Sequence, residues 1–199
     1  MWNFTGRQND VAGTYNVLNG NWISGISFID NMRLGNQDEI SEDSKNNNAR
    51  NTYFFLPFIL GLIGLFFIYQ QDPKRFWILL LFFLFTGLAL KIYLNERPFE
   101  PRERDYALVG SFYVFAIWIG MGAFYLAKKA KTLIKFKGTA PMLVLVCFLA
   151  VPLLMAFQNW DDHDRSDRYT AQSMAKSYLQ SIQKEVGAMI FTIGDNDTF

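Results

Sequence analysis

The chain of 199 residues has a single cysteine, a single histidine and no tract of basic residues interleaved with aromatic ones. One cysteine excludes a disulfide within the chain, and Cys147 lies inside an apolar run, where cysteine packs as a small hydrophobic side chain. The net charge of +1 and the missing basic tract exclude the electrostatic surface that binds nucleic acids. We therefore expect no nucleic-acid partner.

Charge is also scarce in four long segments, although 19% of the chain is charged. Because 51% of the residues are hydrophobic while the mean hydropathy is only +0.07, apolar and polar residues must be separated into blocks. The segments are residues 53–70, 76–94, 106–127 and 140–158, and Lys91 is the only formal charge in them. Each approaches the roughly 20 residues that a helix needs to cross a bilayer.

The predicted fold is mainly α: a polytopic membrane protein with about four transmembrane helices, followed by the start of an extracytoplasmic helix and strand. Three regions follow from this pattern. They are a polar extracytoplasmic segment with short helices and a linker (1–52), a four-helix transmembrane region (53–158) and the start of an extracytoplasmic C-terminal domain (159–199).

Shorter elements are expected on both sides of the spans. Apolar residues recur near helical spacing in residues 22–33, which predicts a short interfacial helix. A second helix is predicted from about residue 165 to 184, and "AMIFTI" at 188–193 is typical of a buried strand. Since a lone strand does not form a domain, we expect the chain to be a fragment of a longer protein.

Small residues and one proline inside the spans predict how the helices pack. Gly61 with Gly64, and Ala116 with Gly120, offer flat faces for close helix contacts. Pro152 lies in the interior of the fourth span, where it removes a backbone hydrogen bond, so it should kink that helix.

The orientation follows from the basic residues in the short loops. Five lysines lie after the third span and two basic residues after the first, against three arginines between the second and third. Basic residues in the flanking segments make the two totals equal, but short loops obey the positive-inside rule best. We therefore predict that residues 128–137 are cytoplasmic and that residues 97–105 face outward.

Four spans would bring three polar motifs to the same outer face. The motifs are "NFTGRQND" at 3–10, "RPFEPRERDY" at 97–106 and "NWDDHDRSDRY" at 159–169. The third motif contains a "DDHD" cluster, for which a metal site and a helix start are both conceivable. With no second histidine in the chain, we favour helix capping, with i,i+4 pairs of Asp161 with Arg165 and of Asp164 with Arg168.

Five stretches together resemble one family. "MWNFTGRQND", "NGNWISGISFID", "YLNERPFEPRERDYALVGSFYVFAIWIGMG", "QNWDDHDRSDRYTA" and "FTIGDNDTF" are similar to the bacterial protein O-mannosyltransferase-like multi-pass membrane proteins of the GT-C glycosyltransferase superfamily. The similarity runs in order over nearly the whole chain and fails in the linker and the lysine-rich loop. In that superfamily the catalytic base is an acidic residue of the first outer loop, so the resemblance implies that this residue lies upstream of the fragment, which alone should be inactive.

The resemblance implies transfer of a sugar, mannose by analogy, from a polyprenyl-phosphate donor to a protein or other acceptor. The implied partners are membrane lipid, the lipid-linked donor and the acceptor, in a bacterial inner membrane, with both ends of the chain extracytoplasmic. No cofactor or metal is assigned. The candidate substrate-binding residues are Arg102, Arg104, Asp105, His163, Asp195 and Asp197.

Arg102 and Arg104 are the strongest of these candidates. They precede the third span at the height of a lipid phosphate, and the arginine fork suits phosphate oxygens. Neighbouring acids leave a self-neutralised anchoring loop as the alternative. For the whole chain, the alternative is a non-catalytic membrane anchor for an extracytoplasmic partner-binding domain. A transporter is disfavoured, because the spans lack Asp, Glu, His and Arg.

Overall fold

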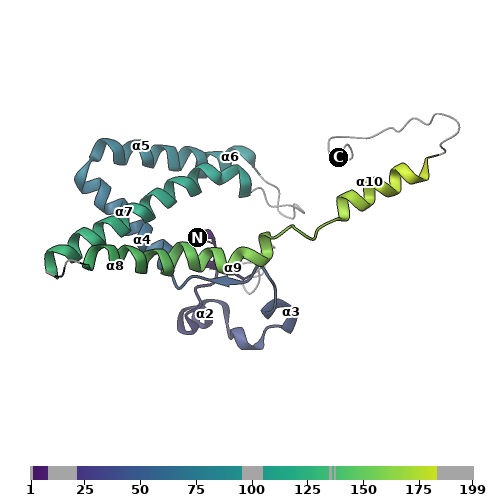
Figure 1. The fold of residues 1–199 in the computed structure, drawn as a ribbon, viewed down its shortest axis with the longest axis horizontal. Coiled ribbons are helices and arrows are strands. Elements are labelled where there is room, and N and C mark those ends of the chain that lie inside the picture. The colour runs from purple at the N-terminus through teal and green to yellow at the C-terminus, as the bar shows by residue number, and fades with distance from the viewer. Residues whose placement is uncertain (1, 9–21, 96–104, 135, 137, 183–199) are drawn as a thin grey trace. The chain divides into compact units, whose positions relative to one another are not determined.

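The computed structural model describes residues 2–8, 22–95, 105–134, 136 and 138–182, and this part of the chain is mainly helical (Figure 1). The chain divides into two compact units, Met1–Asp162 and His163–Phe199. In chain order the elements are α1 (Trp2–Thr5), β1 (Gly6–Arg7), α2 (Ser27–Leu34), η1 (Gln37–Glu39), α3 (Glu42–Lys45), β2 (Asn51–Thr52), α4 (Leu56–Gln71), α5 (Pro73–Leu84), η2 (Phe85–Ala89), α6 (Leu90–Leu94), η3 (Asp105–Leu108), α7 (Val109–Leu133), α8 (Thr139–Phe148), η4 (Leu149–Leu153), α9 (Leu154–His163) and α10 (Thr170–Ser181).

Three helical segments are long and apolar enough to cross a membrane: Pro73–Leu94, Tyr106–Leu133 and Thr139–Asp161. In the most apolar window of each, 0%, 28% and 6% of the residues are buried within the protein. The first and third therefore present apolar side chains that the described chain leaves uncovered, as expected for helices surrounded by lipid. Helix α4 has 16 residues, or roughly 24 Å at 1.5 Å per residue. It is shorter than the hydrocarbon core of about 30 Å, and its role as a fourth span stays a prediction.

Helices α4 and α7 run parallel to each other. Near its start α4 places Gly61 against the ring of Phe115, and near its end Phe67 packs on Tyr125 with ring centroids 5.1 Å apart. Both helices therefore begin at the same end of the bundle. We call it the cap end, because the polar residues 2–8 and 22–53, the cap, precede α4 there. The other end, where α4 stops and Lys128 lies, is the lysine end.

The second helical segment, α5 to α6, runs antiparallel to α7 along its side (Figure 1). Phe83 packs on Trp118 at 5.1 Å between ring centroids, and a side chain at Gly87 would contact Ser111. The segment thus starts at the lysine end and finishes at the cap end. Helix α8 leaves the lysine end and packs on α7, and it continues through η4 and α9 back to the cap end.

Two glycines allow α4 and α7 to approach closely. A Cβ atom at Gly64 would overlap the carbonyl oxygen of Trp118, and one at Gly122 would overlap that of Leu60. Such contact between backbones is what small residues provide in membrane helices. The predicted roles of Gly61 and Gly64 are confirmed. Within the described residues the Ala116 and Gly120 prediction is wrong: Ala116 is exposed and a Cβ at Gly120 would have none of their atoms within 4 Å, because α7 turns Gly122 toward α4.

The core of the first unit is aromatic and is centred on α7. Val114, Phe115 and Trp118 are almost fully buried, and Ile68 and Phe76 pack around them from α4 and α5. From the cap, Phe4 lies on Phe115 with ring centroids 4.1 Å apart. The cap and the helices therefore share one hydrophobic core.

Two of the membrane-length helices contain a π-helical turn. Pro152 lies inside the π-helical turn η4, where its ring cannot make the regular backbone hydrogen bond, and the predicted kink of this helix stays a prediction. In η2, the hydroxyl of Thr86 donates to the carbonyl oxygen of Phe82 at 2.7 Å. A hydroxyl that bonds the carbonyl oxygen four residues earlier competes with the regular backbone hydrogen bonds of the helix, and it commonly bends the helix.

The predicted C-terminal helix starts later than expected. Helix α9 continues to His163, the next helix, α10, begins at Thr170, and the intervening residues are not helical. Asp161 is thus in the last turn of one helix rather than the first turn of another, and the predicted capping role is wrong. The predicted strand at 188–193 lies outside the described residues.

Candidate functional site

The cap is built on a two-stranded antiparallel ribbon. Gly6 pairs with Thr52 and Arg7 with Asn51, and Arg7 also forms a bridge with Trp22. Gly6 has φ +129°, a conformation that favours glycine, and a Cβ there would overlap the carbonyl oxygens of Ile23 and Asn51. Three segments that are distant in sequence are thus fixed together directly before α4.

A buried carboxylate organises the middle of the cap. Asp30, which is 1% exposed, accepts hydrogen bonds from the backbone N–H groups of Ser24 at 2.9 Å and Gly25 at 2.8 Å, and from the Ser24 hydroxyl at 3.0 Å. Burial of a charge is tolerated where such bonds replace water. The carboxylate therefore fixes the entry into α2, the interfacial helix that the sequence predicts.

Two arginines lie near this carboxylate. The guanidinium carbon of Arg33 lies 3.7 Å from the centroid of the Trp22 ring, and Arg33 also donates to the Trp22 carbonyl oxygen. Burial lowers the pKa of Arg33 and of Arg50, while the charge of Asp30 acts in the opposite direction on both. Arginine nevertheless stays protonated at any physiological pH, so these groups neutralise the buried carboxylate.

A set of side-chain hydrogen bonds joins the cap to the end of the last membrane-length helix. The Thr52 amide donates to Oε1 of Gln158 at 2.8 Å, and Nδ2 of Asn51 donates to Oδ1 of Asn159 at 3.0 Å. Asn159 in turn donates to the Tyr53 hydroxyl at 2.6 Å. We call these five residues the clamp. Asn51 and Tyr53 are 5% and 2% exposed, while Thr52, Gln158 and Asn159 are half-buried.

The clamp brings together two of the three polar motifs expected on one face. Residues of the first motif pair with β2, which binds Asn159 at the start of the third. The second motif, 97–106, is described only from Asp105, at the start of η3 and therefore also at the cap end. Four antiparallel passes would bring the three motifs to one end of the bundle. The described residues at the first motif, at Asp105 and at Asn159 do lie at the cap end.

Most of the predicted substrate-binding residues lie outside the described part of the chain. This holds for Arg102, Arg104, Asp195 and Asp197, and for the side chain of Asp105. His163 is described: it is the last residue of α9 and is exposed. The surroundings of His163 with respect to the other candidates therefore stay a prediction.

The "DDHD" cluster spans the end of α9, and a turn follows it. Oδ1 of Asp164 accepts a hydrogen bond from the Ser166 amide at 2.9 Å, and this bond lowers the pKa of the Asp164 carboxyl. Among the described residues, no group of three His, Cys, Asp or Glu side chains could hold a metal ion. The local structure is accounted for by the turn alone.

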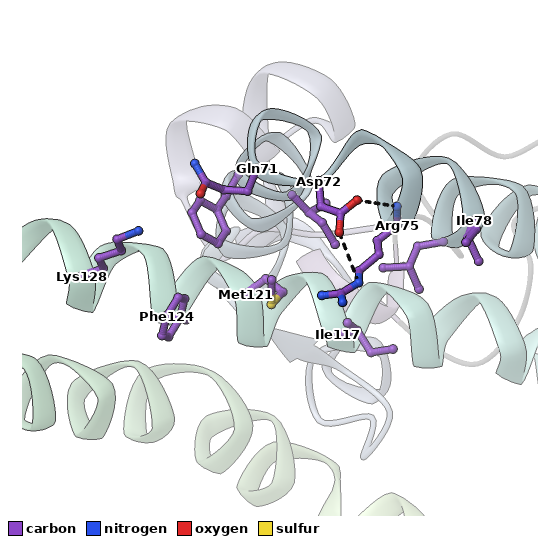
Figure 2. Close-up of a pocket in the computed structure, with 11 residues that line it drawn as sticks. Gln71, Asp72, Arg75, Ile78, Ile117, Met121, Phe124 and Lys128 are labelled. Atoms are coloured by element: carbon purple, nitrogen blue, oxygen red, sulfur yellow. Dashed lines mark hydrogen bonds and ion pairs between the residues drawn. The ribbon is translucent and has the colours of Figure 1, made fainter.

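A groove of about 500 Å³ lies at the lysine end, between α4, α5 and α7 (Figure 2). Its floor is apolar, with Phe67 and Ile68 from α4 and Met121 from α7. Asp72 and Arg75 stand at its rim and form an ion pair at 3.2 Å. Asp72 caps the start of α5, because its carboxylate accepts a hydrogen bond from the Arg75 amide at 3.1 Å. The sequence signal for this cap is an aspartate directly before a proline, Pro73, a pattern typical of helix starts.

Comparison with known proteins adds nothing to this geometry. No family model matches the chain, and no curated protein or solved structure is similar to it. The functional interpretation therefore depends on the residues themselves.

The clamp is the main feature that the sequence interpretation missed. Gln158 and Asn159 directly follow the apolar run, where polar residues ordinarily meet lipid headgroups and water. Their sequence signal is a pair of neutral amide side chains that precedes the first acid, Asp161. Amide side chains can both donate and accept hydrogen bonds, so they suit contacts with another part of the chain.

Proposed function

We propose that the chain is the membrane part of a polyprenyl-phosphate-dependent glycosyltransferase of the GT-C type. It would transfer a sugar, by resemblance mannose, to a hydroxyl group of a protein or other acceptor. The proposal includes α4 as a fourth span and places the cap end on the outer face of a bacterial plasma membrane. The five sequence stretches described above motivate it.

One structural observation supports the proposal: the clamp joins Asn51 and Thr52 to Gln158 and Asn159 at the same end where α7 begins. Arg102 and Arg104 shortly precede η3, which begins at this end. A lipid phosphate lies at the membrane surface, so an arginine pair there would meet the donor where its phosphate and sugar leave the bilayer.

The division of chemical roles follows from the reaction. Sugar transfer needs cations or hydrogen-bond donors on the departing phosphate and a carboxylate that deprotonates the acceptor. We assign the first role to Arg102 and Arg104. Asp105, His163, Asp195 and Asp197 remain candidates for contacts with the sugar or the acceptor, and we assign no residue of this chain as the base.

A membrane anchor for an outer partner-binding domain is the second candidate. The observation in its favour is that two buried side chains of the cap have partners within the chain: Asp30 binds Ser24 and Gly25, and Asn51 binds Asn159. These contacts stabilise the cap as a platform and leave the Asp30 and Asn51 side chains unavailable to a substrate.

Donor binding separates the two candidates and can be measured on the chain itself. We expect purified protein in detergent micelles to bind a polyprenyl-phosphate mannose, with affinity measured by native mass spectrometry. Arg102→Ala and Arg104→Ala should each weaken binding by roughly one to two decades, because a charge-assisted bond to phosphate is lost. Lysine at either position should restore only part of the affinity, since it keeps the charge and loses the fork.

Lys45→Ala is the matched control, because it removes one exposed cation from the cap outside the five stretches. It should bind the donor as the wild type does. Equal donor affinity in the wild type and both arginine-to-alanine variants would support the anchor instead.

A further inference from the structure

The groove at the lysine end has the shape of a binding site for an acyl chain. Phe67 and Ile68, at 7% and 5% exposure, form its base, and Leu79, Ile117 and Met121 continue the apolar lining on α5 and α7. Its volume of about 500 Å³ is within the range of roughly 300–1,000 Å³ that is typical of small-molecule pockets. Because the lining is apolar, an apolar occupant binds favourably by removing apolar surface from water.

The depth of the groove matches one leaflet. Its lining on α7 extends from Ile117 to Lys128, which is roughly 16 Å along a helix at 1.5 Å per residue. Half of the hydrocarbon core is about 15 Å. With Lys128 and the start of α5 at the membrane surface, the far end of the groove reaches the middle of the bilayer.

The rim carries a small excess of positive charge. Arg75, Lys128 and Asp72 line it, and no further charged side chain lines the groove among the described residues, so the three sum to one positive charge. In Figure 2 the Arg75 guanidinium extends from α5 toward Ile117 and Met121 on α7, while Lys128 lies farther along that helix. A phosphodiester carries one negative charge, which complements this rim.

The local hydrogen bonds define which headgroup fits. One carboxylate oxygen of Asp72 accepts from the Arg75 amide and the other contacts its Nε atom. The carboxylate is therefore already engaged and offers little to a choline or ethanolamine cation. The terminal Nη groups of Arg75, whose side chain is 79% exposed, have no hydrogen-bond partner among the described residues and point away from this pair.

We propose that the groove binds an anionic glycerophospholipid. One acyl chain lies between α4, α5 and α7, and the phosphodiester is held by Arg75, while Lys128 adds positive charge at the same end of the helices. This site is at the opposite end of the helices from the cap, and it requires no glycosyl transfer.

The test uses the whole chain in detergent, titrated with phosphatidylglycerol or with phosphatidylcholine of identical acyl chains and followed by native mass spectrometry. We expect phosphatidylglycerol to bind roughly tenfold more tightly or better, as a charge-assisted bond to phosphate predicts. The double variant Arg75→Gln with Lys128→Gln should lose this preference. The matched control, Lys74→Gln with Lys131→Gln, removes two exposed cations from the same end that do not line the groove, and it should keep the preference.

Two further arms identify the source of the affinity. A phosphatidylglycerol with six-carbon chains should bind at least tenfold more weakly than the long-chain lipid, and inorganic phosphate should not displace it. Melting curves recorded without lipid must agree between the two double variants, so that lost binding is not lost folding. Equal affinity for both headgroups, equal loss in both double variants, or displacement by free phosphate would each overturn the proposal.

Discussion

The backbone amide of Thr52 donates a 2.8 Å hydrogen bond to the side chain of Gln158, across 106 residues of chain. Thr52 precedes the first apolar helix, and Gln158 lies near the end of the last one. The bond closes the bundle at the cap end, since it ties an edge of the β1–β2 ribbon to a helix with a largely uncovered apolar surface. Helix α9 is therefore held in place by tertiary hydrogen bonds in addition to apolar contacts.

Asn159→Ala should destabilise the fold. The side chain of Asn159 accepts from Asn51 and donates to Tyr53, both of which are almost fully buried. The loss of two hydrogen bonds to buried groups costs roughly 1–3 kcal/mol. The free energy of unfolding in mixed micelles, measured by denaturant titration and circular dichroism, checks this loss. Asn48→Ala at an exposed cap position is the control, and equal stability of the two variants would contradict a structural role for the clamp.

Alanine at Gly64 and at Gly122 should separate α4 from α7. Each added Cβ meets a backbone carbonyl oxygen of the facing helix, which cannot move aside as a flexible side chain would. We expect a loss of roughly 1–3 kcal/mol per site, the usual cost of overpacking.

Gly120→Ala on the same helix provides the comparison. A Cβ there meets nothing, and alanine has the higher helix propensity, so stability should be unchanged or rise by up to about 1 kcal/mol. Thermal unfolding of the three variants in one detergent measures the contrast. If Gly120→Ala were as damaging as Gly64→Ala, the close approach of α4 to α7 would be wrong.

The sequence predicts the helices well because their signal is local. Blocks of apolar residues with almost no charge identify the three membrane-length helices, and α4 coincides with the fourth block. Which glycine faces which helix is not local information. Because α7 is apolar over most of its surface, its pattern does not fix its rotation, and Gly120 was therefore predicted in the place of Gly122.

Short polar segments were predicted less well, for a different reason. The acids around Asp164 fit a helix start by composition, but the side chain bonds the Ser166 amide and forms a turn, so α10 begins only at Thr170. The clamp depends on residues separated by more than 100 positions, and no local pattern specifies such a pair. Of the predicted site, the arginine pair lies outside the described residues and stays a prediction.

The orientation of the helices can be tested by cysteine labelling after Cys147→Ala. We predict that Asn48→Cys in the cap reacts with an impermeant maleimide in intact cells, whereas Lys131→Cys does not, because the lysine-rich residues 128–137 stay inside by the positive-inside rule. Both positions are exposed, and both should react after permeabilisation. Labelling of Lys131→Cys with protection of Asn48→Cys in intact cells would reverse the topology.

Sugar transfer by the full-length protein tests the account most directly. The measurement is the transfer of radiolabelled mannose from a polyprenyl-phosphate donor to acceptor, at varied donor concentration, for the wild type and for Arg102→Ala and Arg104→Ala at matched expression and folding. We predict transfer by the wild type, and in each variant a requirement for roughly ten to a hundred times more donor, from the loss of one charge-assisted phosphate contact. No transfer by the wild type, or an unchanged donor dependence in both variants, would contradict the proposed function and leave the chain as a membrane anchor.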